Sequence, residues 1–495
     1  MSTIEHTADP GDAVRAAGTD PAEGGVKGRT ARGLTAATAF SLVLRVAGMA
    51  VGMVTAAILA RHLAPSGYGL FSLALTLGTA AAQIADMGVT VTVSSRIARE
   101  KDAGRILGTG LAIRTTVAAV ATVVLIVLAA AGAFGGSSDV IVVTAIATPL
   151  SAASILSAGA TARFRPEISA ALALIQGVLW LGAVAVVAGI GGSLTVLAWC
   201  FVGVVVVQTV IGLGMNRRVV PLGRPSSAYA RQILAVSWPL AVSSLAVSLY
   251  YRFDSVILFQ AKGADEVGFY SAAYKFIDVA QLAPSLLVAP LLPLAAASLG
   301  GAAARRHVLF SLATRVGMVV GVGTGLMMAV LAPVLVAYLY GSAFDPAVRP
   351  LLWLALAFVG ICLGWVGTTI SSALGQAKPI AMVTVPVAVV SLGVQLWACN
   401  RWGAIGAAAV TAGTELVVGV AMCLLAARAM TARLPVRPLA TIFVVGLATA
   451  FAALAVDWPW WVEAVLAAAV FVAAAVGLRV VTLADARRTL SGRSL

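Results

Sequence analysis

The stretch from Gly69 to Ser94 constrains the fold more than any other part of the chain. It is apolar and long enough to cross a lipid bilayer as one helix. Polar side chains nevertheless recur in it every three or four residues: Ser72, Thr76, Thr79, Gln83, Asp86, Thr90 and Ser94. These steps keep one helical face, so we expect a polar stripe facing other protein or a water-filled cavity. An acid inside a membrane is costly, and Asp86 therefore indicates a functional role.

The composition predicts an all-α, polytopic membrane protein. Of the 495 residues, 61% are hydrophobic and 11% are charged, and the mean hydropathy is +1.01. We predict about 14 transmembrane helices from length and hydropathy. They run roughly over 34–60, 68–94, 107–133, 140–161, 168–190, 193–215, 233–260, 268–296, 308–339, 347–374, 379–399, 404–427, 438–456 and 462–483. Residues 1–33 have no apolar period, and we expect them to form a disordered cytoplasmic tail.

The basic residues predict how the chain is oriented. It has 33 Lys and Arg and a formal net charge of +14. With a cytoplasmic N-terminus, nearly all of them fall in cytoplasmic segments, and we count Arg114 among these. The exceptions are Arg61, Lys262, Arg349 and Arg401 on the outer side and Arg45, Arg252 and Lys275 within spans. The positive-inside rule thus predicts a plasma-membrane protein with both termini cytoplasmic. The charge reflects topology, and no nucleic-acid partner is expected.

A second stretch repeats the first one. Gly69 and Ser72 align with Gly268 and Ser271, and the stripe continues after Gly268 with Lys275 and Asp278. We therefore predict two parallel six-helix bundles, 34–217 and 218–430, around a central cavity. Residues 431–495 would add two further helices and a cytoplasmic tail. Repeats of this kind occur in many transporters.

Charged residues inside the spans are the candidate site. The cations that could bind an anion in the cavity are Arg45, Arg252 and Lys275. The candidate coupling or cavity acids and polar groups are Asp86, Asp254, Asp278, Gln83, Thr76 and Thr79. Arg252 and Asp254 are two residues apart on a helix, so they point in different directions and do not pair. Structural roles stay open: Arg45 bonded to carbonyls, Asp254 in packing, and Lys275 with Asp278 as a self-neutralising pair.

Catalytic and metal-binding patterns are not evident in the sequence. The three histidines and four cysteines have no metal-ligand spacing, and no nucleophile lies near a base. We therefore expect a protein without enzymatic activity, cofactor or metal. A membrane glycosyltransferase or polymerase is the alternative from another class. It would need an acidic catalytic motif on a sizeable outer loop, whereas the outer connections near 261–267 and 340–346 are short.

Three segments resemble a known family. They are Arg-His-Leu-Ala-Pro-Ser-Gly-Tyr-Gly-Leu-Phe-Ser-Leu-Ala at 61–74, Arg-Phe-Asp-Ser-Val-Ile-Leu at 252–258, and Val-Gly-Phe-Tyr-Ser-Ala-Ala-Tyr-Lys-Phe at 267–276. They resemble the Wzx-type polysaccharide flippases of the multidrug/oligosaccharidyl-lipid/polysaccharide exporter superfamily, over about residues 34–430. The resemblance implies a V-shaped pair of bundles around a cationic cavity.

The resemblance also implies a function. It suggests that an undecaprenyl-pyrophosphate-linked oligosaccharide moves from the inner to the outer leaflet by alternating access. H⁺ and Na⁺ are the candidate coupling ions, membrane lipid surrounds the protein, and a monomer is expected. Lipid II flippases and cation-coupled multidrug exporters of the same superfamily remain alternatives.

Overall fold

The computed structural model is predominantly helical in the residues that it describes. It describes residues 31–97, 100, 102–134, 138–156, 166–216, 221–298, 303–456 and 458–477, without the side chains of 31–39, 166, 216, 238–252, 303 and 377. No strand occurs in these residues. The elements are α3 (Ala31–Asp86), α4 (Val89–Ile97), α5 (Ala103–Ala130), α6 (Ser138–Ser151), η2 (Ala152–Ile155), α8 (Pro166–Gly189), α9 (Leu194–Asn216), α10 (Ser227–Lys262), α11 (Ala264–Ala280), α12 (Leu282–Ala297), α13 (Ala303–Tyr340), η4 (Ser342–Ala347), α14 (Val348–Ala373), α15 (Ala377–Ala429), α16 (Val436–Leu454) and α17 (Trp460–Gly477). Residues 1–30 of the predicted tail lie outside the described residues.

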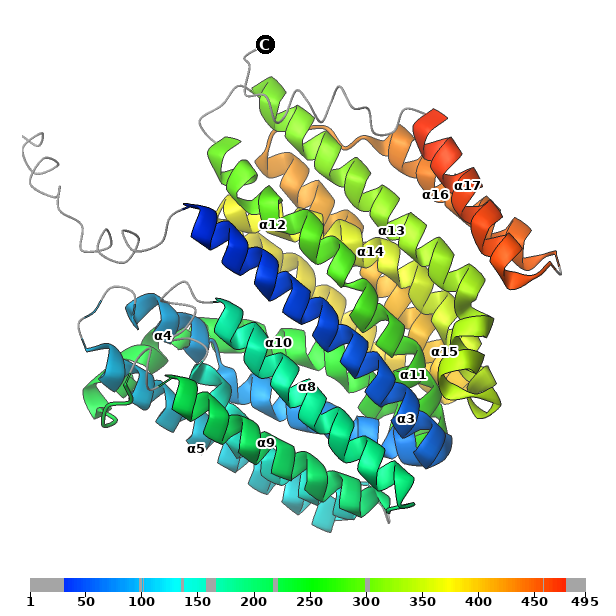
Figure 1. Cartoon of the computed structure of the whole chain (residues 1–495). Coiled ribbons are helices and arrows are strands. Elements are labelled where there is room, and N and C mark those ends of the chain that lie inside the picture. Colours follow the sequence, from blue (N-terminus) through cyan, green and yellow to red (C-terminus); the bar gives the residue numbers. More distant parts are fainter. Residues whose placement is uncertain are drawn as a thin grey trace, which may run out of the picture.

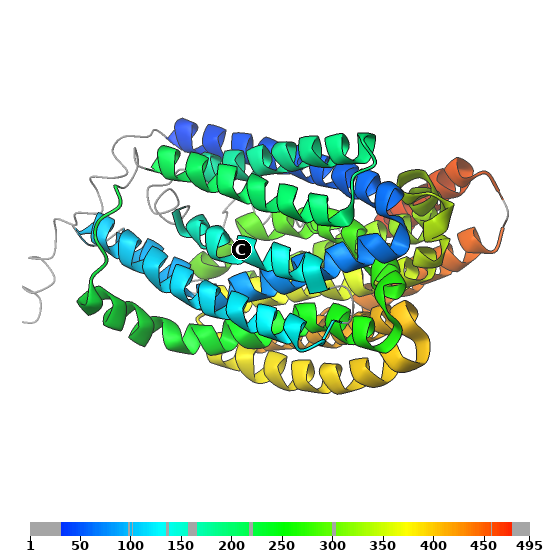
Figure 2. The same ribbon diagram turned by 90° about the horizontal axis from the view of Figure 1, so that it is seen from below.

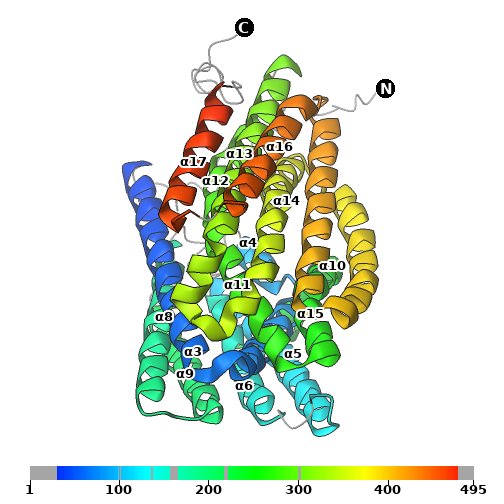
Figure 3. The same ribbon diagram turned by 90° about the vertical axis from the view of Figure 1, so that its right-hand side faces the viewer.

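The helix lengths agree with the predicted number of membrane crossings. Eleven helices of the described chain are long and apolar enough to cross a membrane. Two of them, in α3 and α15, would be about 70 Å or longer if straight, roughly twice a bilayer's thickness. Each one instead folds back on itself (Figures 2 and 3). Counted as two crossings each, and with α10 added, they give the fourteen predicted spans.

Local backbone chemistry explains both reversals. In α3 the helix is interrupted at Ala64, whose φ is 55°. The next residue is Pro65, which disfavours the helical conformation in the residue before it. In α15 the interruption is at Gly403, with φ 58°, where a residue without Cβ is least strained. Each reversal thus places two antiparallel spans side by side.

The spans form two groups with α3 and α11 between them. Helices α4, α5, α8 and α9 lie on one side, and α13, α14 and α15 lie on the other (Figure 1). Helices α16 and α17 pack outside α13 (Figures 1 and 3), where Gly446 fits against Val322 and Phe471 lies close to Gly323. The predicted boundary at 217/218 falls between the end of α9 at Asn216 and the start of α10 at Ser227.

Helices α3 and α11 are in close contact at the glycines that the sequence repeat paired. A Cβ at Gly69 would overlap the carbonyl oxygen of Ala264, and a Cβ at Gly268 would overlap that of Pro65. The backbones of α3 and α11 therefore touch at their repeat-equivalent residues. Aromatic rings lie beside the contact, with the Tyr68 and Phe344 centroids 5.7 Å apart. Only glycine allows so close an approach.

The structure corrects the predicted helix for residues 68–94. Met87 (φ 44°) and Gly88 (φ 71°) break it, so α3 ends at Asp86 and α4 begins at Val89. The polar stripe is consequently divided between two helices. The predicted span 268–296 is likewise interrupted at Gln281, between α11 and α12. Pro284 lies in the first turn of α12, where its missing N–H costs no helical hydrogen bond.

Candidate functional site

A cavity of about 340 Å³ lies between α3, α8 and α9 on one side and α10 and α11 on the other. The Ala64 reversal divides α3 into a first arm and a second arm, and residues of both arms line the cavity. The other lining residues come from α8, α9, α10 and α11. Its lining residues are Gly52, Thr55, Ala56, Leu59, Tyr68, Phe71, Ser72, Leu75, Thr76, Trp180, Phe201, Asp254, Ser255, Tyr270, Ser271, Tyr274, Lys275 and Asp278. Four predicted site residues are therefore brought together: Thr76, Asp254, Lys275 and Asp278. The stripe on α3 faces the stripe on α11 across this cavity.

Lys275 and Asp278 form the accessible charged pair of the cavity. Lys275 Nζ lies 3.7 Å from Asp278 Oδ2, one helical turn along α11. The side chains are 33% and 51% exposed. An ion pair this accessible contributes little to stability. The ammonium therefore remains available to a ligand anion.

The cavity is closed at the glycine contact and opens away from it. Phe71 and Tyr270, close to the glycines, are 1% and 2% exposed. Thr79 and Asp278, about two turns further along the same helices, are exposed. Access to the cavity therefore comes from the end opposite to Gly69 and Gly268.

Asp254 is held by hydroxyl groups at the edge of the cavity. Tyr270 donates its phenol hydrogen to Asp254 Oδ2 over 2.5 Å, and the Ser255 amide lies 2.6 Å from Asp254 Oδ1. Tyr270 Oη is also 3.2 Å from Thr411 Oγ1 of α15. Charge-assisted hydrogen bonds of this kind hold a carboxylate in a fixed orientation.

Behind Asp254 lies a second, small polar hollow. Asp254, Gln395, Thr411 and Glu415 line it between α10 and α15. Glu415 is 4% exposed, and Gln395 Oε1 is buried without a hydrogen-bond partner among the described residues. Glu415 was not predicted as a site residue from the sequence. Glu415 could have been found in the sequence because it is an acidic residue at the middle of an apolar span, which is the property that identified Asp86.

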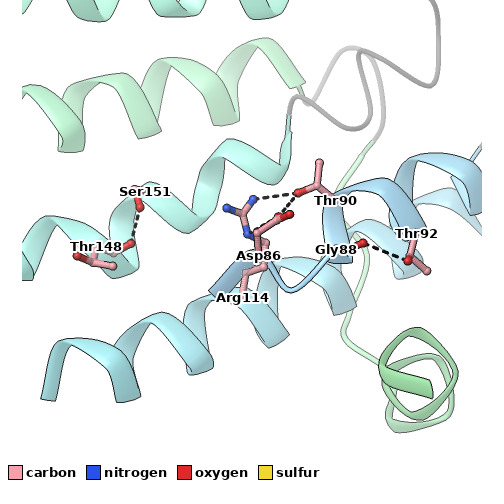
Figure 4. A network of polar contacts seen from close by, with 7 residues as sticks. All are labelled: Asp86, Gly88, Thr90, Thr92, Arg114, Thr148 and Ser151. Carbon is pink, nitrogen blue, oxygen red and sulfur yellow. Dashed lines mark hydrogen bonds and ion pairs between the residues drawn. The ribbon is translucent and has the colours of Figure 1, made fainter. Parts of the chain in front are cut away.

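Asp86 lies outside the cavity, in an ion pair that the sequence did not predict (Figure 4). Arg114 Nε lies 3.3 Å from Asp86 Oδ1, and Arg114 Nη1 donates to Thr90 Oγ1 over 3.2 Å. Thr90 in turn donates to Asp86. The three side chains bridge the break between α3 and α4.

The assignment of Arg114 to a cytoplasmic connection was wrong. Arg114 lies inside α5, about 16 Å from its first residue, and its side chain is only 6% exposed. The positive-inside count treats every cation near a span end alike and so overlooks a buried one. Its depth within the span was the available signal.

The other predicted residues lie apart from this cavity or outside the described side chains. Arg45 is exposed on α3, two turns from Gly52 on the same face. It thus points along the line that leads out of the cavity. Arg252 lies on α10, but its side chain is not described. Thr79 lines a neighbouring hollow, and Gln83 is exposed.

Metal-binding geometry is not found in the described part of the chain. No group of three or more His, Cys, Asp or Glu side chains in those residues could hold a metal ion. Cys362, Cys399 and Cys423 are buried free thiols. The described residues instead form a cavity with a charged and polar lining.

Solved structures of membrane proteins share this fold. The lipid II flippase MurJ in an inward closed conformation matches with a TM-score of 0.72 and 11% identity, over 90% of this chain and 98% of that one. A multidrug resistance MATE family transporter of the MOP superfamily, in an inward-facing conformation, matches with a TM-score of 0.58 and 17% identity, over 78% and 94%. A MOP superfamily transporter from Pyrococcus furiosus matches with a TM-score of 0.56 and 16% identity, over 80% and 95%.

Sequence comparison gives the family. No curated protein matches the chain. The family model described as "Polysaccharide biosynthesis protein" matches residues 34–297, which is more than half of the chain and includes both repeat stretches. The chain therefore belongs to the polysaccharide biosynthesis protein family, as a multi-pass membrane protein with the fold of the MOP superfamily.

Proposed function

We propose that the protein is a flippase that moves an undecaprenyl-pyrophosphate-linked oligosaccharide from the cytoplasmic to the outer leaflet of the plasma membrane. The observation that carries the proposal is the accessible Lys275 ammonium in a cavity between two apolar bundles. The family supplies the polysaccharide context. The MurJ match supports a lipid-linked substrate, because that protein is itself a lipid II flippase.

The substrate's chemistry fits such a cavity. A pyrophosphate cannot cross hydrocarbon without compensation of its charge. Lys275 would supply one cation, with its Asp278 partner displaced toward water. Arg45 would meet the headgroup at the open end of the cavity, and Arg252 would add a bidentate phosphate contact from α10. Outward movement of an anion across an inside-negative membrane is favourable by about 2.3 kcal/mol per charge per 100 mV.

Alternating access would use the two halves, 34–217 and 218–430, as moving bodies. The described conformation is closed at Gly69 and Gly268. With both termini cytoplasmic, it would be the state that accepts substrate from the inner leaflet. Separation of α3 from α11 at the glycines would then release the substrate outward. A single chain contains both halves, which supports action as a monomer.

Ion coupling would act through the hollow behind Asp254. Binding of H⁺ or Na⁺ there would change the charge next to Tyr270 and hence the packing of α10 against α11 and α15. The buried Glu415 and the Gln395 amide oxygen support an ion-dependent role for this hollow. An imposed H⁺ or Na⁺ gradient that leaves the flipping rate unchanged would remove coupling from the proposal.

Reconstituted liposomes with fluorescent undecaprenyl-pyrophosphate oligosaccharide provide the test. Wild-type protein should accelerate flipping, and Lys275→Gln should slow it about tenfold or more, since a charge-assisted phosphate contact contributes about 1.5–3 kcal/mol. Lys262→Gln is the matched control, because Lys262 is an exposed lysine at the far end of α10. Wild-type protein that does not accelerate flipping, or equal rates in the two variants, would refute the proposal.

An organic-cation exporter is the second candidate, and one observation favours it. The described lining of the cavity contains the two carboxylates Asp254 and Asp278 but the single ammonium Lys275. An acidic cavity suits a cationic drug. Accumulation of a fluorescent organic cation in the same liposomes, abolished by Asp278→Asn and unaffected by lipid-linked oligosaccharide, would favour this function over the first.

A further inference from the structure

A further hollow, larger than the central cavity, lies within the N-terminal half. It measures about 420 Å³, within the range of small-molecule sites, and is bounded by the second arm of α3, α6, α8 and α9. None of its lining side chains is charged. Polar, uncharged residues line it instead, among them Thr79, Thr148, Ser169, Gln176 and Gln208. The central cavity, with its ion pair, has a different chemistry.

Two of these hydroxyls are buried without a hydrogen-bond partner among the described residues. They are Thr148 Oγ1 and Ser169 Oγ, and Thr148 is only 3% exposed. Figure 4 shows the neighbouring Ser151 hydroxyl donating to the Thr148 carbonyl over 2.6 Å, so nearby hydroxyls do find partners. A buried polar group without a protein partner is unfavourable unless something else hydrogen-bonds to it. The wall of the hollow therefore contains hydrogen-bonding groups that the described protein atoms leave unpaired, and a polar ligand could pair with them.

The hollow adjoins the central cavity and shares part of its wall. Leu75 and Phe201 line both. Phe201 packs edge-on against Trp180 with ring centroids 5.4 Å apart, and Trp180 stacks on Phe71 at 5.6 Å. An aromatic wall thus stands where the charged and the neutral hollows meet. Aromatic faces pack well against the C–H faces of sugar rings.

We propose that the neutral hollow is the subsite for the uncharged sugars of the lipid-linked substrate. This inference rests on the flippase function proposed above. A pyrophosphate or a metal ion would find no countercharge in the hollow, and a prenyl chain would leave its buried hydroxyls unpaired. Sugar hydroxyl and N-acetyl groups match the Ser, Thr and Gln groups, and the apolar surfaces of Leu172 and Val205 suit their C–H faces. The pyrophosphate would stay at Lys275 while the glycan occupies the N-terminal half.

Two transport probes separate a glycan subsite from a general role. They are undecaprenyl pyrophosphate carrying a neutral pentasaccharide and undecaprenyl pyrophosphate alone, each offered in reconstituted liposomes. The double variant Gln176→Leu/Gln208→Leu should raise the KM for the glycan-bearing probe about tenfold and leave the bare probe unchanged. Gln376→Leu, at the start of α15 and outside both hollows, is the matched control.

A milder variant guards against misfolding. A Cβ at Gly78 would lie 3.7 Å from Thr148 Oγ1, an ordinary contact, so Gly78→Ala should fold and narrow the hollow. It should lower transport of the glycan-bearing probe a few-fold without changing transport of the bare one. Equal effects on both probes, or no effect on either, would overturn the glycan subsite.

A direct binding measurement distinguishes this failure from failure of the flippase proposal. Equilibrium dialysis of the detergent-solubilised full chain with the free pentasaccharide should show binding that Gln176→Leu/Gln208→Leu weakens about tenfold. If wild-type protein transports neither probe yet binds the pentasaccharide in this way, the flippase function fails and the sugar site stands. Transport of both probes at equal efficiency, without pentasaccharide binding, would overturn the sugar site alone.

Discussion

The two halves of the molecule use intramembrane charge in opposite ways. In the N-terminal half, Asp86 pairs with an Arg114 side chain that is 6% exposed. In the C-terminal half, Lys275 and Asp278 face each other along α11 with 33% and 51% of their side chains exposed. Asp86 belongs to the first polar stripe and Lys275 and Asp278 belong to the second, whereas Arg114 comes from α5.

The difference shows that a repeated pattern does not fix a repeated role. Asp86 sits where α3 ends, and its partners Thr90 and Arg114 come from beyond the break at Met87 and Gly88. That pair joins helices. The ion pair between Lys275 and Asp278 lies within one continuous helix, α11. We therefore expect charge to support structure in the first half and ligand binding in the second.

Loss of Arg114 should have the largest effect on stability. Arg114→Met would leave Asp86 without its cation, and breaking a buried pair costs about 3–5 kcal/mol. Because Asp86 is 31% exposed, water would compensate part of this, and we expect a loss of about 2 kcal/mol. Denaturation in mixed micelles measures the free energy of unfolding.

The double variant Asp86→Asn/Arg114→Met sharpens this test. It removes both charges, so it should be more stable than Arg114→Met alone. If the single variant has the wild-type free energy of unfolding, the Asp86–Arg114 pair does not stabilise the fold, and the proposed difference between the two halves is refuted.

A side chain added at either Gly69 or Gly268 should weaken the contact between α3 and α11 to a similar extent. A Cβ at Gly69 or at Gly268 would overlap backbone of the opposite helix. Such overpacking typically costs about 1–3 kcal/mol, and only in the closed arrangement. Gly69→Ala and Gly268→Ala should therefore favour separation of α3 from α11, seen as faster thiol labelling of a Ser72→Cys reporter in the otherwise cysteine-free chain.

Gly48→Ala is the control for the glycine pair. No atom lies within 4 Å of a Cβ at that position on the first arm of α3. It should label at the wild-type rate. If one glycine variant labels much faster and the other labels at the wild-type rate, the two glycines do not contribute equally to the contact between α3 and α11, which contradicts the prediction.

Much of the architecture could be predicted because bilayer thickness and hydropathy determine span length. The repeat also aligned Gly69 with Gly268, and both residues lie at the contact between α3 and α11. The break at Met87 could not be predicted, because a positive φ at a methionine depends on tertiary packing. The partner Arg114 of Asp86 could not be predicted for a similar reason. Arg114 follows it by 28 positions in the sequence, and only the fold brings α5 against the end of α3.

Loss of the Tyr270 hydroxyl should have a moderate effect. Tyr270→Phe removes the donor to Asp254 and the contact with Thr411, while the ring remains in place. A hydrogen bond to a charged group contributes about 1.5–3 kcal/mol, but Asp254 keeps its Ser255 partner, so about 1 kcal/mol is expected. Denaturation in the same micelles measures the loss, and Tyr338→Phe, at a tyrosine of α13 that is 79% exposed, serves as the comparison. Equal losses would show that Asp254 does not depend on Tyr270.

Lys275 should have the smallest effect on stability, although it is the residue on which the proposed function most depends. Its ion pair with Asp278 is exposed and spans a single turn, and such pairs contribute about 0.3–0.5 kcal/mol. Lys275→Met should therefore unfold within about 0.5 kcal/mol of wild-type protein while losing most of its flipping activity. Arg114→Met should show the reverse: clear destabilisation, with the remaining folded protein still able to bind substrate. If Lys275→Met were instead the less stable of the two, the charges of the two halves would have exchanged roles, and Arg114 would become the candidate for substrate binding.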